Sequence, residues 1–277
     1  MDERLISIST TPSGITTITI SRPHRRNAVN PATARALYSA FLAFEDDPTQ
    51  KVAILTGSDG FFCAGADLVD LTLQSKQDPS KVPLDPQDRD HLQPVQDRNI
   101  APMGPSRLQV KKPVIAAVAG HAVAGGLELS LLADMRVVEE DATFGVYCRR
   151  WGVPLIDGGT VRLQAIVGLG RALDMILTGR PVSAQEALSM GLANRVVPKG
   201  KALEEATKIA EQLLLFPNGC MNVDRDSCYY AAYNASSFED AMRNEYDHGV
   251  EVLQTESIQG AARFASGKGR HGGFEKL

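Results

Sequence analysis

Residues 111–129 read KKPVIAAVAGHAVAGGLEL, and they join a predicted buried strand to a predicted apolar helix. The strand covers residues 114–118, a short apolar run that Gly120 closes. The helix opens near Gly125. A helix N-terminus carries backbone N–H groups without partners inside the helix, together with a positive partial charge. The N–H of Gly125 is therefore a candidate donor to a developing oxyanion.

Glu128 lies one turn inside the same predicted helix, so its carboxyl can face the same ligand as Gly125. Leucines occupy positions 127, 129, 131 and 132, which indicates that this carboxyl is partly buried. Burial raises the pKa of a carboxyl and suits it to acid–base chemistry. The alternative is a first-turn carboxylate that only complements the helix dipole.

Strand-like and helix-like stretches alternate along most of the chain. Apolar or β-branched runs predict further strands at residues 15–20, 52–56 and 134–138. Helical periodicity or amphipathic character predicts helices at residues 160–167, 170–178, 202–216 and 238–253. This alternation favours an α/β fold, and the near-continuous apolar strands indicate a sheet covered on both faces.

Two further helices show start signals. Asn30 and Pro31 are typical of an N-cap and a first helical residue. The helix they open has an apolar stripe formed by Ala34, Leu37, Tyr38, Phe41 and Leu42. Ser183 and Glu186 form a predicted capping box for the helix over ALSMGL at residues 187–192.

A second glycine-containing motif, FFCAGADL at residues 61–68, follows the strand at 52–56. Its small residues let the backbone approach a ligand closely, so the N–H of Ala66 is a second candidate donor to a carbonyl oxygen. The alternative is a tight turn in which Asp67 serves as a cap. A third motif, PLIDGGT at 154–160, places Asp157 on a glycine-rich turn before a helix, either as a functional carboxylate or as an N-cap.

Other polar and aromatic residues have competing interpretations. His121 is interpreted as structural. Trp151 either lines an acyl pocket or packs in the core, and the core is the favoured interpretation. Lys268 and Arg270 either bind phosphates or belong to a solvated tail. Residues 79–105 are rich in proline and predict a long, mobile loop that forms part of the acyl pocket.

The composition excludes several classes of protein. Of the 277 residues, 43% are hydrophobic, and the net charge is −4, which argues against nucleic acid or an anionic membrane as the main partner. The four cysteines form no CxxC pair and indicate a reducing compartment. The N-terminus shows no signal or transit pattern, and EKL at 275–277 departs from a peroxisomal tripeptide. We therefore expect a cytoplasmic protein without membrane spans.

Together these segments resemble the crotonase, or enoyl-CoA hydratase/isomerase, superfamily. The segments that carry the resemblance are SRPHRRNAVN, FCAGADL, KKPVIAAVAGHAVAGGLEL, ATFG, VPLIDGGTVRL, GRALDMILTGR and ALSMGLANRVV, in that order. The resemblance implies a spiral of ββα units over residues 1–200. It implies a C-terminal helical region at 201–277 that assembles the chain into a homotrimer or a dimer of trimers.

The resemblance also implies a site. Ala66 and Gly125 match the two backbone donors that hold a thioester oxygen in this superfamily. The coenzyme A arm is expected along two segments, with Arg26, Ala28, Ala64, Asp67 and Leu68 as substrate-binding residues. The implied substrate is an acyl-CoA, with no metal and no cofactor besides the coenzyme A that the substrate carries.

The catalytic carboxyls depart from the hydratase pattern. Glu128 matches the first of two hydratase glutamates, but the second position holds Cys148, and Asp157 matches a carboxylate that several isomerases use. We expect hydration of a 2-enoyl-CoA by Glu128 and Asp157. The alternatives are double-bond isomerisation through Asp157, a catalytically weak acyl-CoA-binding relative, and RNA binding.

Overall fold

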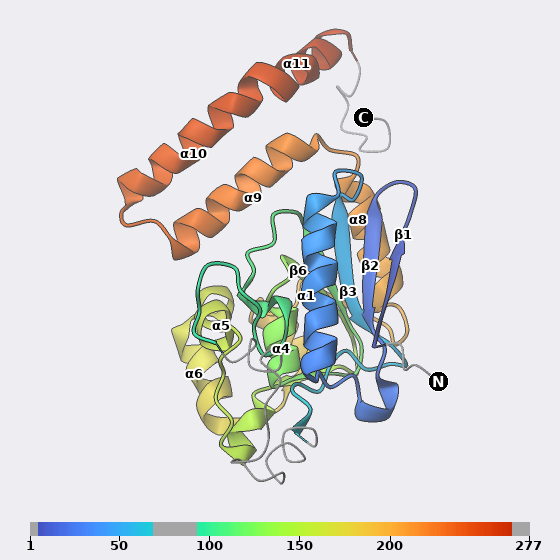
Figure 1. The fold of residues 1–277 in the computed structure, drawn as a ribbon. Helices are drawn as coiled ribbons and strands as arrows, with labels where there is room; N and C mark the ends of the chain where they lie inside the picture. The colour runs from blue at the N-terminus through green and yellow to red at the C-terminus, as the bar shows by residue number, and fades with distance from the viewer. Residues whose placement is uncertain (1–4, 69–92, 268–277) are drawn as a thin grey trace.

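The computed structural model describes residues 5–68 and 93–267, and it has the expected α/β architecture (Figure 1). The main sheet has the strand order β1-β2-β3-β4-β6-β9. Its strands are β1 (Ile6–Thr10), β2 (Ile15–Ile20), β3 (Val52–Gly57), β4 (Val114–Val118), β6 (Met135–Glu139) and β9 (Arg195–Val197). The first pair, β1 and β2, is antiparallel, and all other pairs are parallel.

A second, smaller sheet forms beside the first and contains β5 (His121–Val123), β7 (Thr143–Gly145) and β8 (Val182–Ser183). The chain leaves the main sheet at β4, enters the small sheet at β5 and continues directly into helix α4 (Gly125–Ser130). This β–β–α order is that of the expected spiral. It places the N-terminus of α4 at the end of β5.

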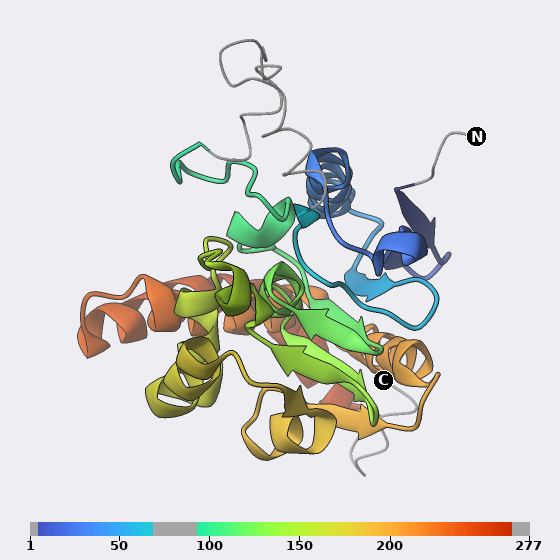
Figure 2. The same ribbon diagram turned by 90° about the horizontal axis from the view of Figure 1, so that it is seen from below.

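Helices cover both faces of the main sheet, as predicted. Along β4, Val114, Ala116 and Val118 face a core that includes α1 (Pro31–Asp46), whereas Ile115 and Ala117 face α8 (Ala202–Leu213). Figure 2 shows α1 and α8 on opposite sides of the strands. The remaining helices near the core are α5 (Gly159–Val167), α6 (Leu169–Thr178) and α7 (Ala184–Ser189).

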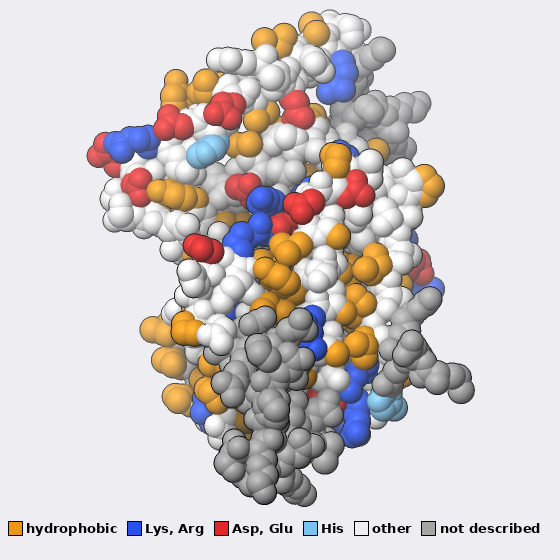
Figure 3. Space-filling model, in the orientation of Figure 1, with side chains coloured by type: hydrophobic (Ala, Val, Ile, Leu, Met, Phe, Trp, Pro, Cys, Tyr) orange, Lys and Arg blue, Asp and Glu red, His pale blue; other side chains and the backbone are white. Residues whose placement is uncertain are grey.

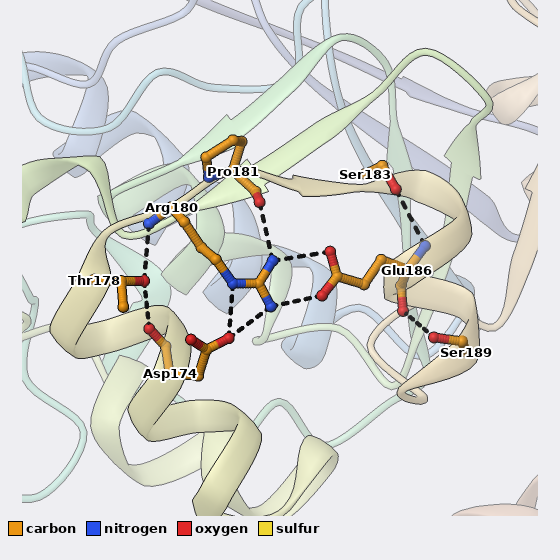
Figure 4. A network of polar contacts seen from close by, with 7 residues as sticks. All are labelled: Asp174, Thr178, Arg180, Pro181, Ser183, Glu186 and Ser189. Carbon is orange, nitrogen blue, oxygen red and sulfur yellow. Dashed lines mark hydrogen bonds and ion pairs between the residues drawn. The ribbon is translucent and has the colours of Figure 1, made fainter.

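The predicted start of α1 is confirmed, since Asn30 is its N-cap and accepts a 2.9 Å hydrogen bond from the N–H of Thr33. The predicted capping box at α7 is half right. Ser183 accepts from the N–H of Glu186 at 3.2 Å, but the Glu186 carboxylate binds Arg180 instead of returning to Ser183 (Figure 4). Arg180 also pairs with Asp174, and it thereby links the end of α6 to the start of α7.

The C-terminal region contains α9 (Asn218–Tyr233), α10 (Phe238–Val252), the short η5 (Leu253–Ser257) and α11 (Ile258–Ala265). Figure 1 shows α9 beside the line formed by α10 and α11, at one end of the molecule. None of these helices has a buried residue. Helix α9 contacts the core at Asp134, whose carboxylate accepts hydrogen bonds from Arg225 at 2.8 Å and from Tyr229 at 2.7 Å.

The predicted loop at 79–105 has two parts. Residues 79–92 lie outside the described residues. The end of the stretch is not the mobile loop that the sequence predicts, because Ala101 and Met103 are fully buried and the short helix η3 (Pro105–Arg107) follows at once. Among the helices of the described residues, none is long and apolar enough to cross a membrane.

Candidate active site

The two glycine-containing motifs lie side by side. Cys63 of the first motif and Ala122 of the second form a parallel bridge. The N–H of Cys63 donates to the carbonyl of His121 at 2.9 Å, and the N–H of Val123 donates back to the carbonyl of Cys63 at 3.2 Å. This pairing places the two motifs next to each other.

Two glycines permit this close approach. A Cβ on Gly126 would lie 2.0 Å from the carbonyl oxygen of Cys63, closer than any side chain can come. Gly65 has a φ of +98°, and a Cβ there would lie 3.1 Å from the backbone N of Gly125. The segments that carry Ala66 and Gly125 therefore pack closely against each other, and Gly65 and Gly126 leave no room for side chains of their own.

The N–H groups of Ala66 and Gly125 make no hydrogen bond with the described residues. The neighbours of Ala66 are engaged, because the carbonyl of Gly65 accepts from Val29 and the N–H of Asp67 donates to the carbonyl of Val29. Gly125 is the first residue of α4, where N–H groups lack intrahelical partners. The structure thus brings together the two donors that the sequence predicts.

Both donor residues line a cavity of about 280 Å³ with mainly apolar walls. Its lining comprises Val29, Asn30, Pro31, Ala64, Ala66, Asp67, Leu68, Pro102, Met103, Ala124, Gly125, Glu128, Tyr147, Cys148, Trp151, Val153, Pro154, Ile156 and Asp157. The core interpretation of Trp151 is wrong, because this side chain borders the cavity and is 71% exposed. It lies on the short helix η4 (Tyr147–Trp151), which leaves the smaller sheet.

Glu128 is a buried carboxyl of the cavity with a raised pKa. Its side chain is only 2% exposed, and Oε1 accepts hydrogen bonds from the N–H groups of Asp157 at 3.0 Å and Gly159 at 2.8 Å. Burial and the negative charge of Asp157 raise the pKa of Glu128 to about 8, although the two backbone donors act in the opposite direction. A carboxyl with this pKa can release and take up a proton near neutral pH.

Asp157 is buried beside Glu128 and lines the same cavity. The N-cap of α5 is Gly158 rather than Asp157. Instead, Oδ1 of Asp157 accepts from the N–H of Met103 at 2.9 Å and from the hydroxyl of Ser106. The carboxylate therefore joins the α5 turn to the segment before β4.

Cys148 lies on η4, buried in the wall of the cavity. Burial and the nearby charge of Glu128 raise the pKa of its thiol. A thiol with a raised pKa stays neutral near pH 7 and is a poor replacement for a carboxyl acid.

The expected substrate-binding residues occupy different surroundings. Ala64, Asp67 and Leu68 border the cavity, whereas Arg26 is exposed and Ala28 is buried outside the cavity lining. The carboxylate of Asp67 forms a buried ion pair of 3.0 Å with Arg22. Arg22 also donates to the carbonyl of Ala28 at 2.5 Å, so this pair fixes the two segments to each other.

Sequence reasoning missed four polar or sulfur-containing residues that shape the site, namely Arg22, Met103, Ser106 and Arg162. Arg22 and Arg162 stand inside the quoted motifs SRPHRRNAVN and VPLIDGGTVRL, which is a signal for their importance. Met103 belongs to the proline-rich stretch at 79–105 and Ser106 follows it directly, and no periodicity marks either residue. Among the described residues, no cluster of His, Cys, Asp and Glu could hold a metal ion.

The comparison that decides the family is a match to the family model described as enoyl-CoA hydratase/isomerase, which covers residues 10–265. The chain belongs to this family. It is 36% identical over 203 residues to an enoyl-CoA hydratase of Mycobacterium tuberculosis, which covers 71% of this chain and 70% of that protein. It is 37% identical over 202 residues to a carnitinyl-CoA dehydratase of Salmonella typhi, with the same coverage.

Solved structures of the enoyl-CoA hydratase/isomerase family confirm the crotonase-like fold. An enoyl-CoA hydratase from Mycobacterium marinum superimposes with a TM-score of 0.81 at 28% identity, covering 95% of this chain and 96% of that one. An enoyl-CoA hydratase from Mycobacterium tuberculosis gives the same TM-score and coverage at 30% identity. The resemblance inferred from the sequence motifs is therefore confirmed, and the chain is an enzyme of the hydratase type.

Proposed function

We propose that this enzyme catalyses the reversible hydration of a 2-enoyl-CoA to a 3-hydroxyacyl-CoA. The observation that carries the proposal is Glu128, a buried carboxyl with a pKa raised to about 8. It lies in the same cavity as the N–H groups of Ala66 and Gly125, which no group of the described residues accepts. Relatives named as an enoyl-CoA hydratase and a carnitinyl-CoA dehydratase support this reaction class.

In the proposed mechanism, Ala66 and Gly125 donate hydrogen bonds to the thioester oxygen of the substrate. Glu128 takes a proton from a water molecule while the water oxygen bonds to C3 and the electrons of the C2–C3 double bond pass to the thioester oxygen. The two donors stabilise that charge, and each donor of such a pair is worth about 3 kcal/mol of barrier. Glu128 then returns the proton to C2, and the negative charge of Asp157 assists by keeping the proton affinity of Glu128 high.

The test measures the rate of hydration of crotonyl-CoA between pH 6 and pH 10. The reaction is monitored by the loss of absorbance of the conjugated double bond. Because Glu128 must be ionised to accept the proton, the rate should rise with pH and level off above about 8. Glu128→Gln should abolish this rise and most of the turnover. A wild-type rate for Glu128→Gln would contradict the proposal.

Double-bond isomerisation is the second candidate, because Asp157 borders the same cavity and could move a proton between carbons of a bound enolate. A 3-enoyl-CoA substrate separates the two reactions, since isomerisation yields the conjugated 2-enoyl-CoA without adding water. A faster turnover of 3-enoyl-CoA than of crotonyl-CoA would favour isomerisation. Binding of an acyl-CoA with neither turnover would identify a catalytically weak relative.

The C-terminal helices support an assembly of several copies. Large apolar side chains on α10, η5 and α11 are exposed in the single chain, and Figure 3 shows apolar side chains along this end of the surface. They are Phe238, Met242, Tyr246, Leu253, Ile258 and Phe264. Helices with no buried residue gain stability when a second copy covers their apolar faces. We propose a homotrimer or a dimer of trimers.

A further inference from the structure

A buried turn at Ala101–Gly104 lies directly against the oxyanion donor. The turn is closed by two hydrogen bonds, from the N–H of Ala101 to the carbonyl of Gly104 at 3.0 Å and from the N–H of Gly104 to the carbonyl of Ala101 at 2.8 Å. A Cβ on Gly104 would lie 2.4 Å from the carbonyl oxygen of Ala34, so the turn packs tightly against α1. The position of this turn is therefore fixed on one side by a helix of the core.

On its other side the turn contacts α4 through Met103. A Cβ on Gly125 would lie 2.5 Å from the sulfur and 2.8 Å from Cγ of Met103. The Met103 side chain thus fills the space that any other residue at 125 would need, and it is fully buried. Because protein interiors are close-packed, moving Met103 would leave the first residue of α4 without support.

The carboxylate of Asp157 binds the segment that carries Met103. Its Oδ1 accepts hydrogen bonds from the N–H of Met103 and the hydroxyl of Ser106. Arg162 strengthens the link, because its guanidinium donates to the carbonyl of Ser106 at 2.5 Å and to that of Leu108 at 2.9 Å. Four hydrogen bonds therefore join the segment 103–108 to the start of α5.

We propose that Asp157 is a positioning residue, which acts through Met103 to hold Gly125 in place as an oxyanion donor. The proposal rests on the proposed function, since it assigns Gly125 the thioester oxygen. It differs from a proton-carrying role, because Oδ1 is used by two donors that hold the wall of the cavity. The backbone N–H of Asp157, which binds Glu128, is common to every residue type except proline, so substitutions of Asp157 leave that bond available.

The experiment compares Asp157→Asn with Asp157→Ala, using cinnamoyl-CoA as a probe. The absorption of this conjugated thioester moves to longer wavelength when its carbonyl oxygen accepts strong hydrogen bonds. Asn keeps an oxygen that can accept from Met103 and Ser106, so Asp157→Asn should retain the wild-type red shift. Asp157→Ala should lose more than about half of it, with a fall in kcat of about tenfold and a KM within about threefold.

A proton-carrying Asp157 gives the opposite pattern. Both variants would then lose turnover together and both would keep the wild-type red shift, which would overturn the proposal. If the wild type itself shows no red shift with bound cinnamoyl-CoA, the oxyanion pair is wrong and the proposed function fails with it. If the wild type shows a red shift and Asp157→Ala keeps it in full, only the positioning role of Asp157 is wrong.

Met103→Ala gives an independent measurement in case Asp157→Ala does not fold. This variant keeps the hydrogen bond to Asp157 but removes the side chain behind Gly125, so it should also lose more than about half of the red shift. Leu108→Ala is the matched control, because it deletes a buried side chain from the same segment that does not line the cavity. Equal red shifts in these two variants would overturn the proposal.

Discussion

At the scale of single residues, Glu128 illustrates a competition between burial and hydrogen bonding. Two backbone N–H groups at the start of α5 favour its charged form, yet burial and the charge of Asp157 prevail and raise its pKa to about 8. An unfolded chain releases this proton near the ordinary value of 4.5, whereas the folded chain keeps it until about 8. The folded state therefore loses stability as the pH rises through that window.

Glu128→Gln should remove this loss, because glutamine does not ionise. We expect the free energy of unfolding of the variant, relative to wild type, to increase by roughly 2–4 kcal/mol between pH 5 and pH 9. Urea unfolding of both proteins at the two pH values measures the change. A difference between the two proteins that is the same at both pH values would show that Glu128 titrates normally.

Cys148→Ala should leave hydration within about tenfold of wild type, or roughly 1.4 kcal/mol of barrier. The reason is that a neutral thiol contributes packing to the cavity wall rather than proton transfer. Steady-state rates with crotonyl-CoA check this, and Cys228→Ala, which changes an exposed thiol on α9 outside the cavity lining, is the control. A loss of several orders of magnitude at position 148 alone would assign the thiol a part in the chemistry.

The sequence predicts Glu128 and the two donors because apolar neighbours and glycines mark their positions. It does not predict the place of Trp151, because a large aromatic side chain suits a core and a cavity mouth equally well. The partners of Asp157 are also absent from the pattern. Met103 and Ser106 are more than fifty residues away, and only the folded chain brings them to its carboxylate.

At the scale of elements, the sequence predicts the main-sheet strands β2, β3, β4 and β6, but not β1, the short strands β5, β7, β8 and β9, or the helices α9 and α11. Continuous apolar runs such as β3 and β4 are buried on both faces, so composition alone identifies them. The sequence of α9 mixes polar and apolar residues and buries none of them within one chain, which removes the periodic signal. Its first turn is instead fixed by a distant side chain, since Glu256 accepts from the N–H groups of Gly219 at 3.1 Å and Cys220 at 2.8 Å.

Glu256→Ala should lower the free energy of unfolding by about 1–2 kcal/mol, because the start of α9 loses both its acceptors and a favourable negative charge. Glu256→Gln keeps one acceptor oxygen and should lose less. Thermal denaturation of the three proteins provides the measurement. Equal melting temperatures would show that solvent caps α9 as well as Glu256 does.

Arg180 joins α6 to α7 through Asp174 and Glu186 (Figure 4), but its contribution should be small. All three side chains are at least one-third exposed, so water screens the ion pairs. We expect Arg180→Ala to lower the free energy of unfolding by less than about 1 kcal/mol, and raising the salt concentration should reduce the difference. A loss well above that limit, unaffected by salt, would indicate that Arg180 supports the helix connection through packing.

At the scale of the whole molecule, the site depends on two sheets meeting. The main sheet delivers the motif at 61–68 and the smaller sheet delivers the motif at 121–129, and neither sheet alone has both donors. Motif order along the chain predicts the spiral. The resemblance also implies an assembly of chains, and in the structure that proposal rests on the exposed faces of the last helices. The proposed assembly can therefore be tested by changing the exposed apolar side chains of these helices.

If α10 and α11 pack against other copies, the wild type should elute with a mass three or six times that of the 29.8 kDa chain in size-exclusion chromatography with light scattering. Introducing charge at the exposed apolar positions, as in Ile258→Glu with Phe264→Glu, should shift the protein to monomers, because burying an unpaired carboxylate at an interface is costly. Ile8→Glu on β1 is the control, since it adds one such carboxylate to a similarly exposed side chain far from these helices in sequence. A monomeric wild type, or a double variant that keeps the wild-type mass, would show that these faces do not form the interface.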